Sequence, residues 1–377
     1  QGIFGIKEVQ DVLSLPDSLF TDDKLEHFGA ANYLKAGLVY ADEITTVSPS
    51  YAEEIQTGFY GERLDGLLRS KNNHLTGILN GINTVEFDPS RDGLIEAAYS
   101  ADDMAPKAVN KRALQEQLGL EVRPDVPVIG IVSRLSSQKG LDLVDHVIAD
   151  IMREDVQLAV LGMGDSRYIN LFSWAEQNYP GRVAARFSMD HSLAHRIYAG
   201  SDIFLMPSQF EPCGLSQMIS LLYGTVPIVR ETGGLRDTVL SYNEYTGDGN
   251  GFSFFNYNAH EMLNTIKRAL AIDREKPDVW QMLMRRGMDG DYSWKHSAEM
   301  YVSLYQCMLS PEPPKDQQDE LIEEPREENT PGSGDEPSAR KAESKPQTGE
   351  VPVVKAKADD REKPEKDKGS KKGKAKK

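Results

Sequence analysis

Short apolar runs alternate with segments of helical spacing between residues 126 and 231. The apolar runs are rich in β-branched residues, which predicts buried strands at 126–135, 156–164, 182–189, 201–208 and 226–231. Apolar residues three and four positions apart predict helices at 141–154, 193–200 and 215–224. Because strands and helices alternate at this spacing, the sequence predicts an α/β fold with a doubly wound parallel sheet.

The pattern is less regular before residue 126. The run 38–48 predicts a strand, and 49–57 predicts a helix that begins with Ser48 and Pro49 as its N-terminal signals. Residues 79–92 have the composition of a loop, and we expect this loop to connect two domains.

The composition changes after residue 310. Residues 311–377 are rich in Pro, Glu, Asp and Lys and almost lack aromatic and large apolar side chains. Such a segment cannot bury enough apolar surface to offset its ordering entropy, so the sequence predicts a disordered tail. Its basic end, "KDKGSKKGKAKK", is open to two interpretations, an electrostatic tether or a solvated tail.

Charge and composition exclude several classes of protein. The formal charge of -16 argues against a general nucleic-acid surface, so an anionic substrate would need a local basic pocket. No run of 18 apolar residues predicts a membrane span, and the first residues lack the pattern of a signal peptide. Two cysteines make no disulfide framework and show no metal-ligand spacing. We therefore expect a cytoplasmic protein.

Residues that could bind a ligand or take part in catalysis follow the predicted strands. Ligands of open parallel sheets bind beyond the carboxyl ends of the strands, where this sequence places Arg134, Lys139, Glu211 and the pair Gly233–Gly234. An arginine and a lysine suit a diphosphate, with a plain surface pair as the alternative. Amides at the helix start around 214–216 would add donors for the same anion.

Glu211 is the most informative of these residues. A carboxylate between strand and helix can accept hydrogen bonds from sugar hydroxyls or stabilise positive charge on an anomeric carbon. Helix capping is the alternative role. Cys213 has no basic partner in the pattern, so we interpret it as a packed residue and not as a nucleophile. His195 is interpreted as a structural residue of its helix.

Several motifs together resemble the bacterial glycogen synthases, also called starch synthases. They are "ITTVSPSYAEEI", "LDGLLR", "GILNGIN", "IVSRLSSQKGLDL", "AHRIYAGSDIFLMPS", "FEPCGLSQ" and "YGTVPIVRETGGLRDTV", in order over residues 1–309. The resemblance implies a GT-B glycosyltransferase with two Rossmann-like domains. It also implies transfer of glucose from ADP-glucose to the non-reducing 4-hydroxyl of an α-1,4-glucan with retention. No metal or other cofactor is expected.

The resemblance assigns roles to the residues quoted above. Arg134 and Lys139 would neutralise the donor diphosphate, and Glu211 would lie by the donor glucose as the third catalytic residue. The substrate-binding residues that it implies are the backbone groups of Cys213, Gly214 and Leu215 near the glucose, Ser216, Thr232, Gly233 and Gly234 near the phosphates, and Asn80 from the other domain.

The resemblance also implies domain boundaries. Residues 1–90, with a helix at 293–309 packing back on them, would be the remainder of the acceptor-side domain, and 91–292 the nucleotide-sugar-binding domain. The family's "KxGGL" donor loop lies upstream of Gln1, so we expect an incomplete first domain, which leaves the activity of the chain as given open. Gln209 and Leu222 replace frequent family arginines, and we expect them to tune binding. Ser188–Met189 replaces a Gly-Tyr pair near the base.

Two other functions stay open at this point. A sucrose- or lipid-directed GT-B transferase commonly has a second glutamate eight positions after the first, where this chain has Ile219. A non-catalytic glucan-associated module is the alternative outside the enzymes. The preferred base and the oligomeric state do not follow from the sequence.

Overall fold

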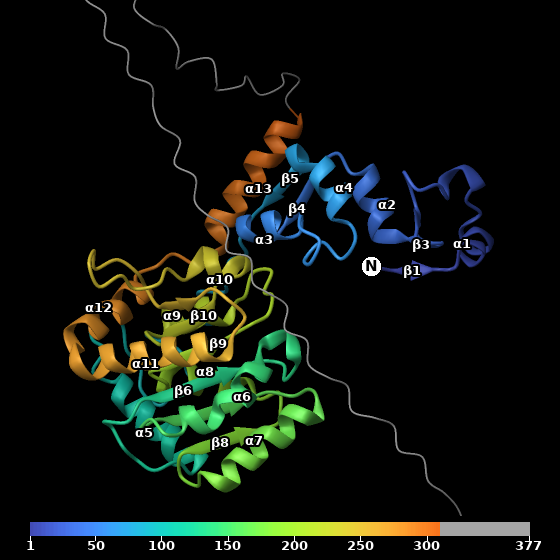
Figure 1. The fold of residues 1–377 in the computed structure, drawn as a ribbon. Helices are drawn as coiled ribbons and strands as arrows, with labels where there is room; N and C mark the ends of the chain where they lie inside the picture. Colours follow the sequence, from blue (N-terminus) through green and yellow to red (C-terminus); the bar gives the residue numbers. More distant parts are fainter. Residues whose placement is uncertain (310–377) are drawn as a thin grey trace, which may run out of the picture. The chain divides into compact units, whose positions relative to one another are not determined.

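A computed structural model describes residues 1–309 of the chain (Figure 1). Its largest element is a six-stranded sheet of the order β11-β10-β9-β6-β7-β8, and all of its pairings are parallel. The strands are β6 (Val128–Val132), β7 (Gln157–Leu161), β8 (Val183–Arg186), β9 (Ile203–Met206), β10 (Val226–Arg230) and β11 (Phe252–Phe254). The predicted parallel α/β sheet is confirmed, whereas β11 had not been predicted. The predicted disordered tail lies outside the described residues.

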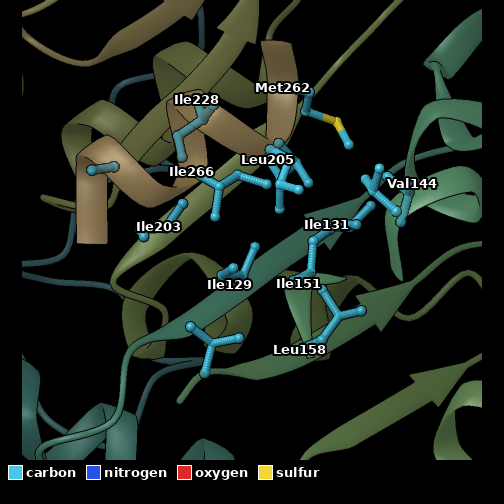
Figure 2. Packing of buried hydrophobic residues seen from close by; sticks show 14 of the residues in the cluster. Ile129, Ile131, Val144, Ile151, Leu158, Ile203, Leu205, Ile228, Met262 and Ile266 are labelled. Atoms are coloured by element: carbon cyan, nitrogen blue, oxygen red, sulfur yellow. The ribbon is translucent and has the colours of Figure 1, made fainter. Parts of the chain in front are cut away.

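Helices cover both faces of this sheet. They are α5 (Lys107–Leu118), α6 (Leu141–Ile151), α7 (Ser166–Asn178), α8 (His191–Gly200), α9 (Ser216–Leu222), α10 (Gly233–Thr238), α11 (Ala259–Glu275) and α12 (Pro277–Met288). Successive residues of a strand point to opposite faces. Ile129 of β6 packs in one core with Val144 of α6 and Ile266 of α11 (Figure 2), while Val128 packs on the other side with Ile197 of α8.

The first part of the chain forms two small sheets. One is antiparallel, of the order β1-β3-β2, and the other is the parallel pair β4-β5. The elements are β1 (Ile3–Phe4), α1 (Ile6–Leu13), a 3-10 turn at Asp17–Leu19, β2 (Glu26–His27), β3 (Ala30–Asn32), α2 (Tyr33–Tyr40), β4 (Ile44–Thr46), α3 (Pro49–Glu54), α4 (Asp65–Ser70), a 3-10 turn at Asn72–His74 and β5 (Leu75–Gly77).

Two predictions for this region have different outcomes. The helix expected from residue 49 is present, and the Ser48 hydroxyl accepts the N–H of Tyr51 as its N-cap. The strand expected at 38–48 is wrong in its first part, since residues 38–40 end α2 and only Ile44–Thr46 form a strand. The Asn32 side chain caps α2, which allows the apolar run to continue as a helix and not as a strand.

The helix α13 (Trp294–Leu309) contacts the segment that follows β5. The Ser297 hydroxyl donates to the Leu79 carbonyl at 2.6 Å, and the Ile82 N–H donates to the Tyr292 carbonyl at 2.8 Å. The residues 79–92 contain no named helix or strand. The domain boundaries stay predictions. Within residues 1–309, none of the helices combines the length and the apolar character needed to cross a membrane.

Candidate functional site

A lysine and a glutamate meet at the carboxyl ends of neighbouring strands. Lys139 follows β6, Glu211 follows β9, and the Lys139 Nζ donates to Glu211 Oε2 at 2.6 Å. Their side chains are only 15% and 9% exposed. The Ser208 hydroxyl donates to the same Oε2 at 3.1 Å. The structure therefore brings together two of the three residues that were predicted to be catalytic.

The turn before α6 fixes the position of Lys139. This residue ends a 3-10 turn (Ser137–Lys139) and is followed by Gly140 with φ +71°. A Cβ atom on Gly140 would lie 1.9 Å from the Pro207 carbonyl oxygen, so only glycine lets the two loops approach this closely. This backbone contact holds the loop of Lys139 against the loop that carries Glu211.

Arg134 lies in the same loop as Lys139, but its side chain is exposed. Its guanidinium donates to the Gln138 Oε1 at 3.1 Å. Gln138 in turn donates to the Phe210 carbonyl at 3.4 Å, and its own carbonyl accepts the Gln209 N–H at 2.8 Å. Arg134 is thus linked to the loop of Glu211 through Gln138, and its long side chain is available to an anion that arrives from solvent.

The glycine pair after β10 packs against the backbone of Glu211. The Gly234 N–H lies 3.2 Å from the carbonyl oxygens of both Glu211 and Pro212. Gly233 has φ +44°, and a Cβ atom there would lie 2.1 Å from the Glu211 carbonyl oxygen. The three loops that follow β6, β9 and β10 are therefore in backbone contact, as the sequence led us to expect for one edge of the sheet.

The groups of Thr232 and Gly233 that were predicted to lie near the phosphates already have a partner. The Thr232 hydroxyl lies 3.0 Å from both carboxylate oxygens of Glu54, and the Gly233 N–H donates to Glu54 Oε1 at 2.9 Å. Glu54 ends α3, and the neighbouring Ser50 N–H donates to Asp237 of α10 at 3.1 Å. The Glu54 carboxylate thus accepts hydrogen bonds from the Thr232 hydroxyl and the Gly233 N–H, the two groups that were predicted to bind a phosphate.

Cys213 and Asn80 are neighbours in the structure. The thiol is buried, and the Asn80 N–H donates to it. Burial raises the pKa of the Cys213 thiol, and the charges of Glu211 and Asp237 act in the same direction. A thiol that resists ionisation is a poor nucleophile, which supports the interpretation of Cys213 as a packed residue.

The start of α9 contains the remaining predicted residues. Gly214 has φ +73°, and a Cβ atom there would lie 2.4 Å from the Gln217 Oε1. Leu215 is 45% exposed. The Ser216 hydroxyl bonds with the phenol of Tyr198, whose pKa burial raises to about 12. The Ser216 side chain is therefore already hydrogen-bonded to Tyr198, and its predicted place near the phosphates stays a prediction.

Arg230 is a residue of this edge that the sequence analysis missed. It is the last residue of β10 and is buried, and its guanidinium donates to the Ser208 carbonyl at 3.0 Å, the Phe255 carbonyl at 3.2 Å and the Tyr60 hydroxyl at 2.9 Å. A charged residue at the end of an apolar strand was a usable signal. Arg230 positions the loop of Glu211 by holding the carbonyl of Ser208.

Two family descriptions match separate parts of this chain. Residues 1–70 match the starch synthase catalytic domain, and residues 115–282 match the glycosyl transferases group 1. The matched parts contain Glu54 of the first segment and Lys139, Glu211 and Arg230 of the second.

Two bacterial glycogen synthases are similar over most of the chain. The protein of Bacillus cereus is 52% identical over 309 residues, which are 82% of this chain and 65% of that protein. The protein of Geobacillus thermodenitrificans is 54% identical over 312 residues, which are 83% of this chain and 64% of that protein. The chain spans just under two thirds of the length of these relatives.

Solved structures share the fold. The catalytic domain of starch synthase IV from Arabidopsis thaliana, bound to ADP and acarbose, has a TM-score of 0.72 at 35% identity, covering 77% of this chain and 61% of that one. A sucrose-phosphate synthase from Thermosynechococcus elongatus has a TM-score of 0.51 at 23% identity, covering 74% of this chain and 62% of that one. The second likeness is one of fold alone.

Proposed function

We propose that the chain, which has the GT-B fold and is 52–54% identical to bacterial glycogen synthases over four fifths of its length, is a member of that family and transfers glucose from ADP-glucose to the non-reducing 4-hydroxyl of an α-1,4-glucan. The configuration at the anomeric carbon would be retained. The ADP in the starch synthase relative supports an adenine nucleotide as the donor. We also propose a cytoplasmic location and a reaction that needs no metal or other cofactor.

The single observation that supports this function best is the contact between Lys139 and Glu211. An ammonium has three N–H donors, and Glu211 engages one of them at 2.6 Å. Two donors remain for the oxygens of a diphosphate. The pair can therefore hold an anionic leaving group on one side and a sugar on the other, at a point where helix starts and loops add backbone N–H groups.

The roles follow from the charges that develop during transfer. When the bond between the anomeric carbon and the diphosphate oxygen breaks, its electron pair goes to that oxygen. Lys139 and the exposed Arg134 would stabilise this negative charge, while the Glu211 carboxylate would stabilise the positive charge on the sugar. The oxygen of the acceptor hydroxyl then forms the new bond to the anomeric carbon, and its proton passes to the departing diphosphate oxygen. Asn80, whose N–H donates to the Cys213 thiol, would contribute to substrate binding from the other domain.

Substitutions of the two cations test donor binding on the 377-residue chain. Arg134→Ala and Lys139→Ala should each weaken ADP binding about tenfold or more, since hydrogen bonds to charged groups contribute about 1.5–3 kcal/mol. Arg112→Ala is the matched control, because Arg112 is 70% exposed on α5 and pairs with Glu116. Calorimetry with ADP measures the effect. Unchanged affinity in both variants would remove these residues from the donor site.

Glu211→Gln separates an enzyme from a binding module. The amide keeps the shape of the side chain, so ADP affinity should change less than about threefold, whereas loss of transition-state stabilisation should lower glucose transfer about 100- to 1,000-fold. Transfer is assayed on a chain extended by the amino-terminal part of its relatives, with Glu116→Gln as the control. If the extended parent chain bound glucan but transferred no glucose, the non-catalytic module would be the better description.

The alternative of a sucrose- or lipid-directed transferase has a specific weakness. The position of the second glutamate in those enzymes is Ile219 here, which is 6% exposed in α9 and packs in an apolar cluster. An apolar side chain there offers no carboxylate to a donor. Transfer to sucrose or lipid acceptors in place of glucan would nevertheless favour that class.

A further inference from the structure

Two histidines and a glutamate form a cluster that the glucosyltransfer reaction does not use. His191 and His195 lie one helical turn apart on α8, and Glu86 lies in the segment after β5. We propose that these three residues bind a divalent transition-metal ion of the zinc type, which ties the segment 79–92 to α8. The ligand atoms would be the Nε2 of both imidazoles and the Glu86 Oε1.

The distances within the cluster suit a tetrahedral ion. The two Nε2 atoms are 3.1 Å apart, and the His191 Nε2 lies 3.2 Å from the Glu86 Oε1. All three ligand atoms lie within 4.8 Å of one another. Bonds of about 2.0–2.1 Å to zinc place tetrahedral ligand atoms about 3.3 Å apart. Two of the three pairs of ligand atoms therefore already have this spacing, and the third pair, the His195 Nε2 and the Glu86 Oε1, lies within 4.8 Å.

A buried carboxylate orients the inner histidine. The His195 Nδ1 lies 2.7 Å from the Asp92 Oδ2, and both side chains are nearly inaccessible at 1% and 3%. Asp92 also accepts the Tyr223 hydroxyl at 2.6 Å and the Leu94 N–H at 2.8 Å. An ionised carboxylate can only accept, so the Nδ1 carries the proton and the Nε2 presents a lone pair. This carboxylate–histidine arrangement recurs behind zinc ligands.

Further neighbours fix the other parts of the cluster. The Asn83 amide donates to the Glu86 Oε2 at 3.1 Å, which leaves the Oε1 for an ion. The Phe87 ring stacks on the His195 ring at a centroid distance of 4.8 Å. The side chains of His191 and Glu86 are 61% and 40% exposed, so an ion can enter from solvent and a water molecule can complete its coordination.

The ligand set determines which metal class fits. Two imidazole nitrogens and one carboxylate suit zinc, cobalt, nickel or copper, whereas calcium and magnesium prefer oxygen ligands. A hydrogen bond between the two histidines without a metal ion accounts less well for the short distances in the cluster. The His191 Nε2 carries at most one proton, which would have to serve both the His195 Nε2 and the Glu86 Oε1. An ion satisfies all three lone pairs at once.

Metal titration of the 377-residue chain tests the site. The chelator-treated chain should bind one Zn²⁺, and His191→Ala should weaken that binding about 100-fold or more, since even outer partners of a metal site contribute about 10- to 100-fold. Glu86→Gln should weaken it about tenfold or more. Both side chains are exposed, so neither variant endangers folding. His260→Ala is the control, because the exposed His260 packs only edge-on against His146 at 5.5 Å.

Two further measurements make the outcome decisive. Co²⁺ in the parent chain should give the visible absorption of a four-coordinate site, and that absorption should be absent in His191→Ala. Zn²⁺ should raise the melting temperature of the parent and of His260→Ala but not of His191→Ala. Equal Zn²⁺ affinity of the parent and His191→Ala, or no binding by the parent, would overturn the proposal.

Discussion

A buried lysine, Lys107, and a partly buried lysine, Lys139, lie at opposite ends of the parallel sheet and have different partners. At the carboxyl ends, Lys139 pairs with the Glu211 carboxylate. At the amino ends, Lys107 donates to the carbonyls of Ala199 at 2.8 Å and Tyr223 at 2.9 Å and to the Thr225 hydroxyl at 2.8 Å. Lys107 therefore connects the loops that precede β9 and β10 through hydrogen bonds. Lys139 pairs with one carboxylate and can still interact with an anionic ligand.

The surroundings of the two lysines differ as well. Lys107 borders a cavity of about 580 Å³ whose lining includes Lys111, Asp202 and Asp273. Burial lowers the pKa of Lys107 to about 7. Lys139 instead faces a carboxylate and keeps a favourable partner for its charge. Burial of a lysine alone therefore does not mark a functional site, because its partners determine whether its charge is available to a ligand.

The largest expected effect is on stability at the amino ends. Lys107→Met removes the donor for three carbonyls, that of Tyr198 at 3.4 Å being the most distant, and for a hydroxyl, so unfolding by urea should show a loss of about 3 kcal/mol. ADP affinity of the folded variant should not change. Lys267→Met is the control, since Lys267 is 47% exposed. A stable Lys107→Met chain with weakened ADP binding would reverse the roles of the two lysines.

A smaller effect with a pH dependence is expected at Asp273. Burial, helped by the charge of Asp202, raises the pKa of Asp273 from 3.8 to about 6. Between pH 4 and 6, Asp273 keeps its proton in the folded chain but loses it in the unfolded chain. The free energy of unfolding therefore falls as the pH rises through this range, and the destabilisation by the ionised Asp273 is complete above pH 6. Asp273→Asn should therefore stabilise the chain at pH 7 by about 1–2 kcal/mol after allowance for solvent.

The gain from Asp273→Asn should shrink as the pH falls through 6 and vanish near pH 4. Urea unfolding at a series of pH values measures it. Asp278→Asn, at an exposed position of α12, serves as the control. A gain that is the same at pH 7 and pH 4 would show that packing, and not the buried charge, accounts for the change.

The smallest effect is expected at the carboxyl ends. Glu54→Gln removes the negative charge that now holds the Thr232 hydroxyl and the Gly233 N–H. If that carboxylate competes with the donor phosphates, ADP should bind about three- to fivefold more tightly. Calorimetry on the 377-residue chain compares the variant with Glu53→Gln, whose position is exposed. Weaker ADP binding would mean that Glu54 supports the site and does not compete for it.

The sequence predicted the parallel sheet well because β-branched runs and helical spacing both report on burial, as at β6 and α6. It failed at residues 38–40, where the Asn32 cap decided between helix and strand. It also missed β11, which has only three residues, Phe252–Phe254. Short or capped elements depend on neighbours that no local pattern reveals.

The site could be predicted in part for a related reason. Strand ends can be read from the pattern, so Lys139 and Glu211 were identified as neighbours before their contact was known. Glu54 and Lys107 gave no signal, since each looks like an ordinary charged residue of a helix. Their partners, such as Thr232 and Thr225, lie more than 100 positions away in the chain. Only the folded arrangement shows which of these charges meet.

The backbone contacts at Gly140 and Gly233 set a limit on how this protein can be altered. The loops of Lys139, Glu211 and Thr232 are in contact through main-chain atoms. A Cβ atom on Gly140 or Gly233 would lie only 1.9 Å or 2.1 Å from a carbonyl oxygen of the neighbouring loop. The loops therefore leave no space for a side chain at either glycine. Under the proposed function, a change of donor preference would therefore be expected from exposed side chains, such as Arg134 and Leu215, and not from rearranged loops.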